Sequence, residues 1–168
     1  MTFFVAIIAG VAALFALTVV RGAPYVPSHR SQVRRAFGEL YPLSNKDCVV
    51  DLGSGDGVVL GIIASRGAKA IGYEINPVLW LMTRFRFRHN RYVSVRLRDY
   101  RLLETLPSEV TVVYAFSTSH NIDIIDRKLR QWSGARPLVF ISYGFQVSGR
   151  EPDETVGAMY LYRYESGE

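Results

Sequence analysis

Apolar residues follow two alternating patterns along the chain from about residue 29 onward. Short apolar runs of strand length are separated by segments in which apolar residues recur at the spacing of one helix face. The pattern predicts helices over residues 29–40, 56–66, 77–90 and 120–132, with a short turn near 101–106. It predicts strands over residues 47–52, 69–74, 93–98, 110–116, 136–143 and 157–164.

Strands that alternate with helices through short connections favour an α/β fold with a mostly parallel sheet. Right-handed crossovers between parallel strands place helices on both faces of such a sheet. The last predicted strand follows the loop at residues 148–153 without a helical segment, so we expect this strand to join antiparallel. The length of 168 residues allows one domain of this kind.

The first 20 residues have a different character, because the run from Thr2 to Val20 contains no charged residue. Its 19 residues nearly span a bilayer core of about 30 Å at roughly 1.5 Å per residue. No basic residue precedes the run, whereas a secretory signal peptide begins with a positive region. We therefore expect a retained transmembrane anchor over residues 1–21, a linker and pre-domain helix over 22–44, and the main domain over 45–168.

The residues that flank the apolar run predict its orientation. Four arginines follow it before the first acid, Glu39: Arg21, Arg30, Arg34 and Arg35. The positive-inside rule then places the main domain in the cytoplasm or its organellar equivalent. The linker contains Pro24 and Pro27, which cannot continue a helix, and Ser28 is the expected N-cap of the next helix.

The net charge of +5 is concentrated in one segment. Residues 84–101 contain seven arginines and one acid, which is typical of a solvated helix face, a membrane-surface patch or a docking site for an acidic partner. No nucleic-acid motif accompanies the charge, so we expect no nucleic acid partner. Trp80 and Phe85 follow a helical face and are expected in the core. The single cysteine, Cys48, excludes an internal disulfide and is expected as a small core residue.

The run from Val49 to Gly57, VVDLGSGDG, carries the most specific chemical signal. It has the order of a strand, a glycine loop and a helix start, but its G-x-G-x-G spacing differs from the G-x-G-x-x-G of dinucleotide folds. A carboxylate inside the loop, Asp56, would repel a pyrophosphate but suits a sulfonium or an amino group. Asp51 and Asp56 therefore favour S-adenosylmethionine over NAD.

These residues, together with Glu74 at the end of the next strand, resemble the first motifs of the class I S-adenosylmethionine-dependent methyltransferases. The resemblance implies a Rossmann-like methyltransferase sheet with S-adenosylmethionine as cofactor and no metal. It implies that the cofactor-binding residues are Asp51, Gly53, Ser54, Gly55, Asp56, Gly57, Glu74, Ile75, Asn76, Asp99 and Tyr100.

The resemblance also implies roles for individual residues. Asp51 would face the methionine amino group, and Glu74 would accept hydrogen bonds from the ribose hydroxyls with help from Asn76. Asp99 would meet the adenine amino group with Tyr100 beside it; the alternative for Asp99 is a cap on the turn that follows. Methyl transfer from a sulfonium requires alignment and exclusion of water, so no catalytic dyad is expected.

A narrower resemblance covers nearly the whole chain. The apolar run, the stretch from Pro24 to Ser28, the glycine loop, and the segment from Gly72 to Pro77 before an arginine-rich helix are similar to single-span protein-lysine methyltransferases. Such enzymes are known from mitochondrial inner membranes and bacterial relatives. The chain departs from their pattern at residues 115–120 and 142–146, where acceptors bind.

The resemblance implies a membrane-anchored enzyme that methylates lysine on a membrane-associated protein. Aromatic side chains would lower the pKa of the lysine by desolvation, and His120 could accept its proton or be an ordinary surface residue. The candidates for the substrate side are Tyr25, Phe116, His120, Tyr143 and Phe145. Three alternatives remain: methylation of a membrane lipid or quinone precursor, a non-catalytic S-adenosylmethionine-binding scaffold, and an NAD-binding module.

Overall fold

The computed structural model of the protein describes residues 4–5, 10 and 28–167. Of the predicted anchor at residues 1–21, all but residues 4, 5 and 10 lie outside the described residues, as do residues 22–27 of the linker. Within the part of the chain that is described, no helix combines the length and apolar character needed to cross a membrane.

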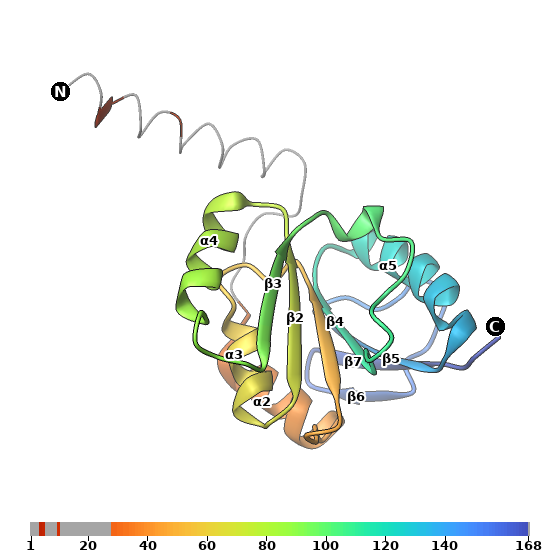
Figure 1. The fold of residues 1–168 in the computed structure, drawn as a ribbon. Helices are drawn as coiled ribbons and strands as arrows, with labels where there is room; N and C mark the ends of the chain where they lie inside the picture. The colour runs from red at the N-terminus through yellow and green to blue at the C-terminus, as the bar shows by residue number, and fades with distance from the viewer. Residues whose placement is uncertain (1–3, 6–9, 11–27, 168) are drawn as a thin grey trace.

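Seven strands form one sheet in the order β3-β2-β1-β4-β5-β7-β6 (Figure 1). The strands β1 to β5 are parallel, and β7 runs antiparallel to both β5 and β6. The mostly parallel sheet and the antiparallel last strand are therefore confirmed. The strands are β1 (Cys48–Leu52), β2 (Lys69–Glu74), β3 (Val93–Leu97), β4 (Val112–Phe116), β5 (Leu138–Tyr143), β6 (Glu154–Val156) and β7 (Met159–Tyr164).

The helices lie close to their predicted positions. The first predicted helix is an α-helix over its first half and continues as a π-helix, and the predicted turn near 101–106 is a 3-10 turn that begins one residue earlier. The helical elements are α2 (Arg30–Arg35), η1 (Ala36–Leu40), α3 (Val58–Ser65), α4 (Pro77–Arg86), η2 (Tyr100–Leu102), α5 (Ser119–Trp132) and η3 (Ser133–Ala135).

The edge strand β6 was not predicted, because Glu154 and Thr155 are exposed and Val156 is only half-buried. It pairs with β7 through a tight hairpin in which Gly157 has a φ of +61°. A left-handed backbone of this kind favours glycine. A three-residue strand with no apolar run gives no periodic signal in the sequence.

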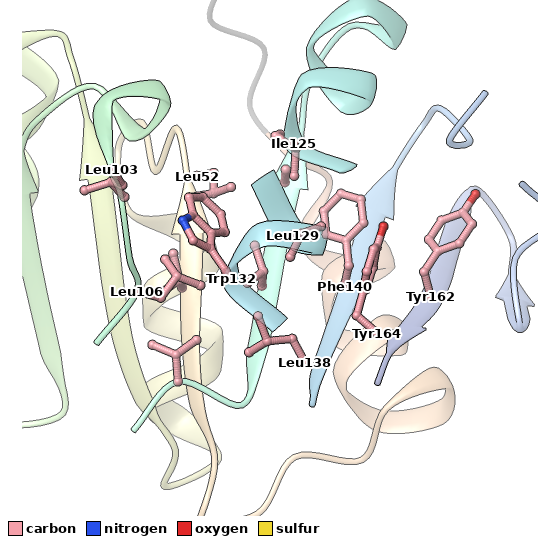
Figure 2. Close-up of a cluster of buried hydrophobic side chains, with 14 of the residues drawn as sticks. Leu52, Leu103, Leu106, Ile125, Leu129, Trp132, Leu138, Phe140, Tyr162 and Tyr164 are labelled. Atoms are coloured by element: carbon pink, nitrogen blue, oxygen red, sulfur yellow. The ribbon is translucent and has the colours of Figure 1, made fainter. Parts of the chain in front are cut away.

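The core lies on both faces of the sheet. Successive residues of a strand point to opposite faces, so Val49 packs in one apolar cluster and Val50 in the other. The helices α2 and α3 cover the first face, and α5 covers the second with Leu129 and Trp132 among the side chains in Figure 2. Cys48 is buried in the second cluster, which confirms its prediction as a core residue.

The topology determines where a site can form. Because β1, β2, β4 and β5 are parallel, their carboxyl ends meet at one edge of the sheet. The chain order reverses between β1 and β4, which lie side by side at the centre of the sheet. Open α/β sheets bind their ligands in the crevice at such a switch point. The predicted residues follow the carboxyl ends of these strands.

Candidate functional site

The glycine loop after β1 depends on three left-handed residues. The φ angles of Gly53, Gly55 and Gly57 are 90°, 53° and 77°, values that side chains of L-residues disfavour. The amides of Gly53 and Ser54 both donate to the carbonyl oxygen of Tyr73 in β2, at 2.9 and 3.0 Å. The loop is therefore anchored on the neighbouring strand before any ligand arrives.

Glu74 at the end of β2 holds the same loop through its side chain. One carboxylate oxygen accepts a hydrogen bond from the Gly55 amide at 2.7 Å, and the other accepts one from the Asn76 amide at 2.8 Å. The residue is 6% exposed. A carboxylate oxygen can accept more than one hydrogen bond, so Glu74 keeps acceptor capacity for a ligand.

The start of α4 is joined to the loop. Asn76 caps the helix by accepting from the amides of Val78 and Leu79 at 2.9 and 3.3 Å, and Pro77 occupies the first helical position. One turn later, the hydroxyl of Thr83 donates to the carbonyl oxygen of Gly55 at 2.9 Å. The loop and helix α4 thus form one hydrogen-bonded unit beside Glu74.

Asp51 is the most perturbed titratable residue at this edge. It is 2% exposed, and within the described residues its Oδ2 atom has no hydrogen-bond partner. Burial, followed by the negative charges of Glu74 and Asp56, raises the pKa of Asp51 to about 8. A buried carboxyl group without a partner is costly, which is the usual mark of a group awaiting a ligand.

The space in front of the loop suits a bound molecule. Gly53 is exposed, and a Cβ atom added to it would meet no heavy atom within 4 Å. Ser54 Oγ is buried and, among the described residues, also lacks a hydrogen-bond partner. A ligand that carries an ammonium group for Asp51 and hydroxyl groups for Glu74 fits this set of acceptors.

Asp56 and Ile75 sit at the rim of this arrangement. Asp56 is half-buried, its carbonyl oxygen accepts from Arg86 at 2.9 Å, and its carboxylate lies 3.9 Å from the same guanidinium group. Ile75 is half-buried between Glu74 and Asn76. Both residues are therefore close in sequence and space to the loop, although neither is locked by as many contacts as Glu74.

Asp99 takes the capping arrangement that was the alternative for it. Its carboxylate accepts from the Arg101 amide at 2.9 Å and pairs with the Arg101 guanidinium at 2.7 Å. Burial opposes ionisation of Asp99, but the hydrogen bonds from Arg101 outweigh it and lower the pKa of the carboxyl group. Tyr100 is half-buried beside it, and burial raises the pKa of its hydroxyl. Contact of either residue with adenine stays a prediction.

The aromatic residues of the substrate side meet at the ends of β4 and β5. Phe116 and Tyr143 are partners in the parallel register, and their ring centroids lie 4.4 Å apart at 32°. Phe145 is 43% exposed, and His120 is exposed in the first turn of α5. The structure therefore brings Phe116 and Tyr143 together, and Tyr25 lies outside the described residues.

Comparisons with known proteins agree with this geometry. No protein-family model matches the chain. A Rattus norvegicus enzyme, named as a lysine N-methyltransferase of the ATP synthase, is 29% identical over 137 residues, or 80% of this chain and 61% of that protein. A Saccharolobus islandicus protein-lysine N-methyltransferase is 29% identical over 144 residues, or 83% of this chain and 88% of that protein.

A solved structure matches most of the described sheet. The RNA methyltransferase from Salinibacter ruber, in complex with S-adenosyl-L-homocysteine, superposes with a TM-score of 0.69 at 29% identity. The match covers 83% of this chain and 92% of that chain.

The chain has the class I methyltransferase fold.

Within the class I methyltransferase fold, the coverage limits what the names of the relatives imply. The chain spans 61% of the length of the rat protein, which is less than two thirds. The agreement with the archaeal protein and the Salinibacter structure extends over most of both molecules. The methyltransferase fold is therefore established over the described sheet, and the two lysine methyltransferases and the RNA methyltransferase differ in their named acceptors.

One contact at the edge of the methyltransferase sheet was missed from the sequence. The Ser28 hydroxyl lies 3.3 Å from the hydroxyl of Tyr114, and Tyr114 is the register partner of Asp51. Ser28 was predicted as an N-cap, but the N-cap of α2 is His29 and no side chain caps it. Tyr114 looked like any apolar strand residue, so only its place opposite Asp51 could have marked it.

Proposed function

We propose that this protein is an S-adenosylmethionine-dependent methyltransferase that acts on a lysine of a membrane-associated protein. The observation that carries the proposal is the glycine loop held by Glu74 beside the buried, unpartnered carboxyl group of Asp51. The Salinibacter relative, which was solved with the product of this cofactor, supports the choice of ligand.

The residues at the carboxyl edge fit the parts of S-adenosylmethionine. Asp51 would hold the amino group of the methionine moiety, and Glu74 would hold the ribose hydroxyls, with Gly53 and Gly55 allowing close approach to the backbone. When bound, the cofactor supplies a methyl group activated by the positive sulfonium. Asp99 reaches a ligand only if its ion pair with Arg101 opens or shares the contact.

A lysine acceptor must be neutral before its nitrogen can attack a methyl group. Phe116 and Tyr143 form an aromatic wall at the ends of β4 and β5, where an acceptor would enter. Desolvation beside such a wall lowers the pKa of an amine and favours the neutral form. His120 is exposed, so we assign the lost proton to solvent or to this residue rather than to a buried base. The names of the rat and archaeal relatives support lysine as the acceptor.

Membrane anchoring is part of the proposal and rests on the sequence. The uncharged run from Thr2 to Val20 would span the bilayer, and the following arginines would keep the domain on the cytoplasmic side or its organellar equivalent. A site tethered by a linker of about ten residues reaches only about 20 Å from the bilayer. The acceptor lysine would therefore lie near the membrane surface.

A methyl-transfer assay in membranes tests the proposal. The full chain is incubated with tritium-labelled S-adenosylmethionine and a membrane extract, and the label is followed into protein, lipid and RNA. Label on lysine in a membrane protein is the expected result. Label in the organic phase would assign the enzyme to a lipid or quinone precursor, and no transfer despite cofactor binding would leave a scaffold. The absence of cofactor binding would overturn the proposal as a whole.

RNA is a second candidate acceptor, because the Salinibacter relative is an RNA methyltransferase that aligns over 92% of its length. The arginine-rich segment at residues 84–101 offers positive charge for a phosphate backbone. Label in the RNA fraction of the same assay, lost after ribonuclease treatment, would favour this candidate over the protein acceptor.

A further inference from the structure

Helix α4 has apolar side chains on two opposite faces. Leu79, Thr83 and Phe87 recur at intervals of four residues, and they are buried or half-buried against the glycine loop and the sheet. A second apolar set, Leu81, Met82 and Phe85, lies on the other side of the helix. An amphipathic helix that packs on a sheet needs only the first of these faces.

The second face is open to solvent. The exposed fractions of Leu81, Met82 and Phe85 are 59%, 58% and 66%. The prediction that Phe85 lies in the core is therefore wrong, because its spacing places it on the outer face of the helix. Trp80 is half-buried and donates from Nε1 to the carbonyl oxygen of Val95 at 3.2 Å, which fixes α4 against the edge strand β3.

Arginines surround the exposed apolar side chains. The guanidinium of Arg88 lies 4.2 Å from the centroid of the Phe85 ring, and that of Arg84 lies 5.6 Å from the Trp80 ring. Just beyond the helix, a shallow hollow is lined by six residues: Arg86, Phe87, His89, Asn90, Arg91 and Tyr92. Arginines that rest on aromatic rings beside apolar side chains are common where a protein meets a membrane interface.

Acidic residues are missing from the same region. The sequence from Ile75 to Arg98 contains six arginines and neither aspartate nor glutamate. Among the described residues of this segment, the ion pair that reaches a carboxylate is that of Arg86 with Asp56. The positive charge around α4 is therefore largely available to an external anion.

We propose that the outer face of α4, formed by Leu81, Met82 and Phe85 with Arg84 and Arg88, is a lipid-contact surface that rests on a bilayer with anionic headgroups. The three apolar side chains enter the boundary between headgroups and acyl chains, and the arginines pair with lipid phosphates. The proposal does not depend on methyl transfer or on the acceptor, because its consequence is lipid contact.

The chemistry of the face favours a bilayer over the other charged partners. Single-stranded nucleic acid is held by aromatic stacking, whereas two of the three exposed apolar side chains, Leu81 and Met82, are aliphatic. A lipid surface accommodates flexible aliphatic and aromatic side chains together and supplies phosphates to the arginines. The face also begins one turn after Asn76, so resting it on a bilayer keeps the carboxyl edge with Glu74 close to the lipid.

A tryptophan reporter tests lipid contact in the full chain. The variant Phe85→Trp is reconstituted into vesicles of phosphatidylcholine alone or mixed with phosphatidylserine, in each case with or without brominated acyl chains. Thr155→Trp, exposed on β6 at the opposite edge of the sheet, is the matched control. The wild-type protein corrects for Trp80 and Trp132. Bromines quench tryptophan only near van der Waals contact, so quenching reports insertion.

We expect bromolipid quenching of Phe85→Trp to be about twofold stronger or more in the phosphatidylserine vesicles, and to weaken with added salt. Thr155→Trp should show no such change. Adding Arg84→Gln and Arg88→Gln to the reporter variant should remove the dependence on phosphatidylserine. Both residues are exposed and lie away from Glu74 and Asp51, so cofactor binding serves as the check that the fold is intact.

Two results would overturn the proposal. One is absence of bromolipid quenching of Phe85→Trp in both kinds of vesicle, and the other is equal quenching of the Thr155→Trp control. If the arginine variants instead lose affinity for RNA while the reporter never contacts lipid, the surface belongs to nucleic acid. Neither result bears on methyl transfer, which the labelled-cofactor assay measures separately.

Discussion

The carboxylate of Glu74 accepts a hydrogen bond from the amide of Gly55 at 2.7 Å, although the two residues are 19 positions apart in the sequence. This bond joins the end of β2 to the loop that follows β1. Glu74 therefore has two tasks in the proposed enzyme: it shapes the loop in the free protein, and it offers acceptor capacity to a ligand. Its loss should affect both cofactor affinity and the stability of the loop.

Replacing Glu74 with glutamine should weaken binding of S-adenosylmethionine by about 2–3 kcal/mol, because charge-assisted hydrogen bonds become neutral or are lost. Calorimetric titration of the folded variant measures the change. Glu104→Gln is the control, since Glu104 is exposed and its side chain takes no part in the proposed site. Equal affinity in the Glu74 variant and the wild type would remove Glu74 from the site.

Asp51 should make the stability of the ligand-free protein depend on pH. Its pKa is about 8 in the folded protein against an ordinary value of 3.8, so the folded state holds a proton that the unfolded chain releases between these values. Stability should therefore fall as the pH rises through this window and level off above about pH 8. Denaturant titrations of wild type and Asp51→Asn from pH 5 to 9 check this, and parallel curves for the two proteins would contradict it.

Gly57 should tolerate no side chain, for two separable reasons. Its φ is +77°, and an added Cβ would lie 2.7 Å from Thr83 Cγ2 and 2.8 Å from Phe87 Cε2. The left-handed backbone alone costs about 1–2 kcal/mol for an alanine, and overpacking adds about 1–3 kcal/mol. Gly149→Ala is the matched control, because it has a φ of +70° and open space around its Cβ. Chemical denaturation should show a clearly larger loss for Gly57→Ala, and equal losses would mean that the α4 contact yields freely.

Phe116→Ala should slow methyl transfer without weakening cofactor binding. Phe116 stacks on Tyr143 at the acceptor side, away from the loop and Glu74, so its loss exposes the acceptor amine to water. We expect at least about a tenfold lower rate at neutral pH, partly recovered at higher pH where more lysine is neutral. Phe145→Ala tests the exposed neighbour. A uniform loss of rate at every pH would indicate a structural effect instead.

Removing residues 1–21 should separate binding from access to the acceptor. Cofactor affinity should be unchanged, while methylation in membranes falls steeply, because the tether no longer raises the local concentration of the site at the bilayer. The rate with membrane extract and the binding constant are measured on the same preparations. Equal methylation by the shortened and full chains would show that proximity to the bilayer does not select the acceptor.

The sequence predicted elements whose signal is local. Strands with apolar runs, such as β1 and β4, and the loop that starts with Gly53 were found because periodicity and glycine spacing depend on neighbours in the chain. The exposed position of Phe85 was not found, since apolar spacing on a helix does not say which face meets the sheet. The hydrogen bond from Thr83 to Gly55 and the contact of Ser28 with Tyr114 join distant residues, and single-sequence patterns carry no record of such pairs.

The residues with two plausible roles divided along the same line. Asp99 could cap a turn or face adenine, and only the placement of Arg101 beside it showed that the cap is formed. Asp51 was predicted from its motif, but its raised pKa depends on complete burial near Glu74 and Asp56, which the fold creates. Chemistry that requires a residue type was visible in the sequence, whereas chemistry that requires an environment was not.

The burial of Cys48 makes the protein suited to spectroscopic labelling. It is the single cysteine of the chain, it is 1% exposed, and burial raises the pKa of its thiol to about 11. A thiol that stays protonated and enclosed reacts slowly with maleimides and methanethiosulfonates. A cysteine introduced at a surface position such as Met82 would therefore be the one reactive thiol without any background mutation. Spin labels placed in turn along α4 and β6 could then measure the depth and tilt of the domain on a bilayer.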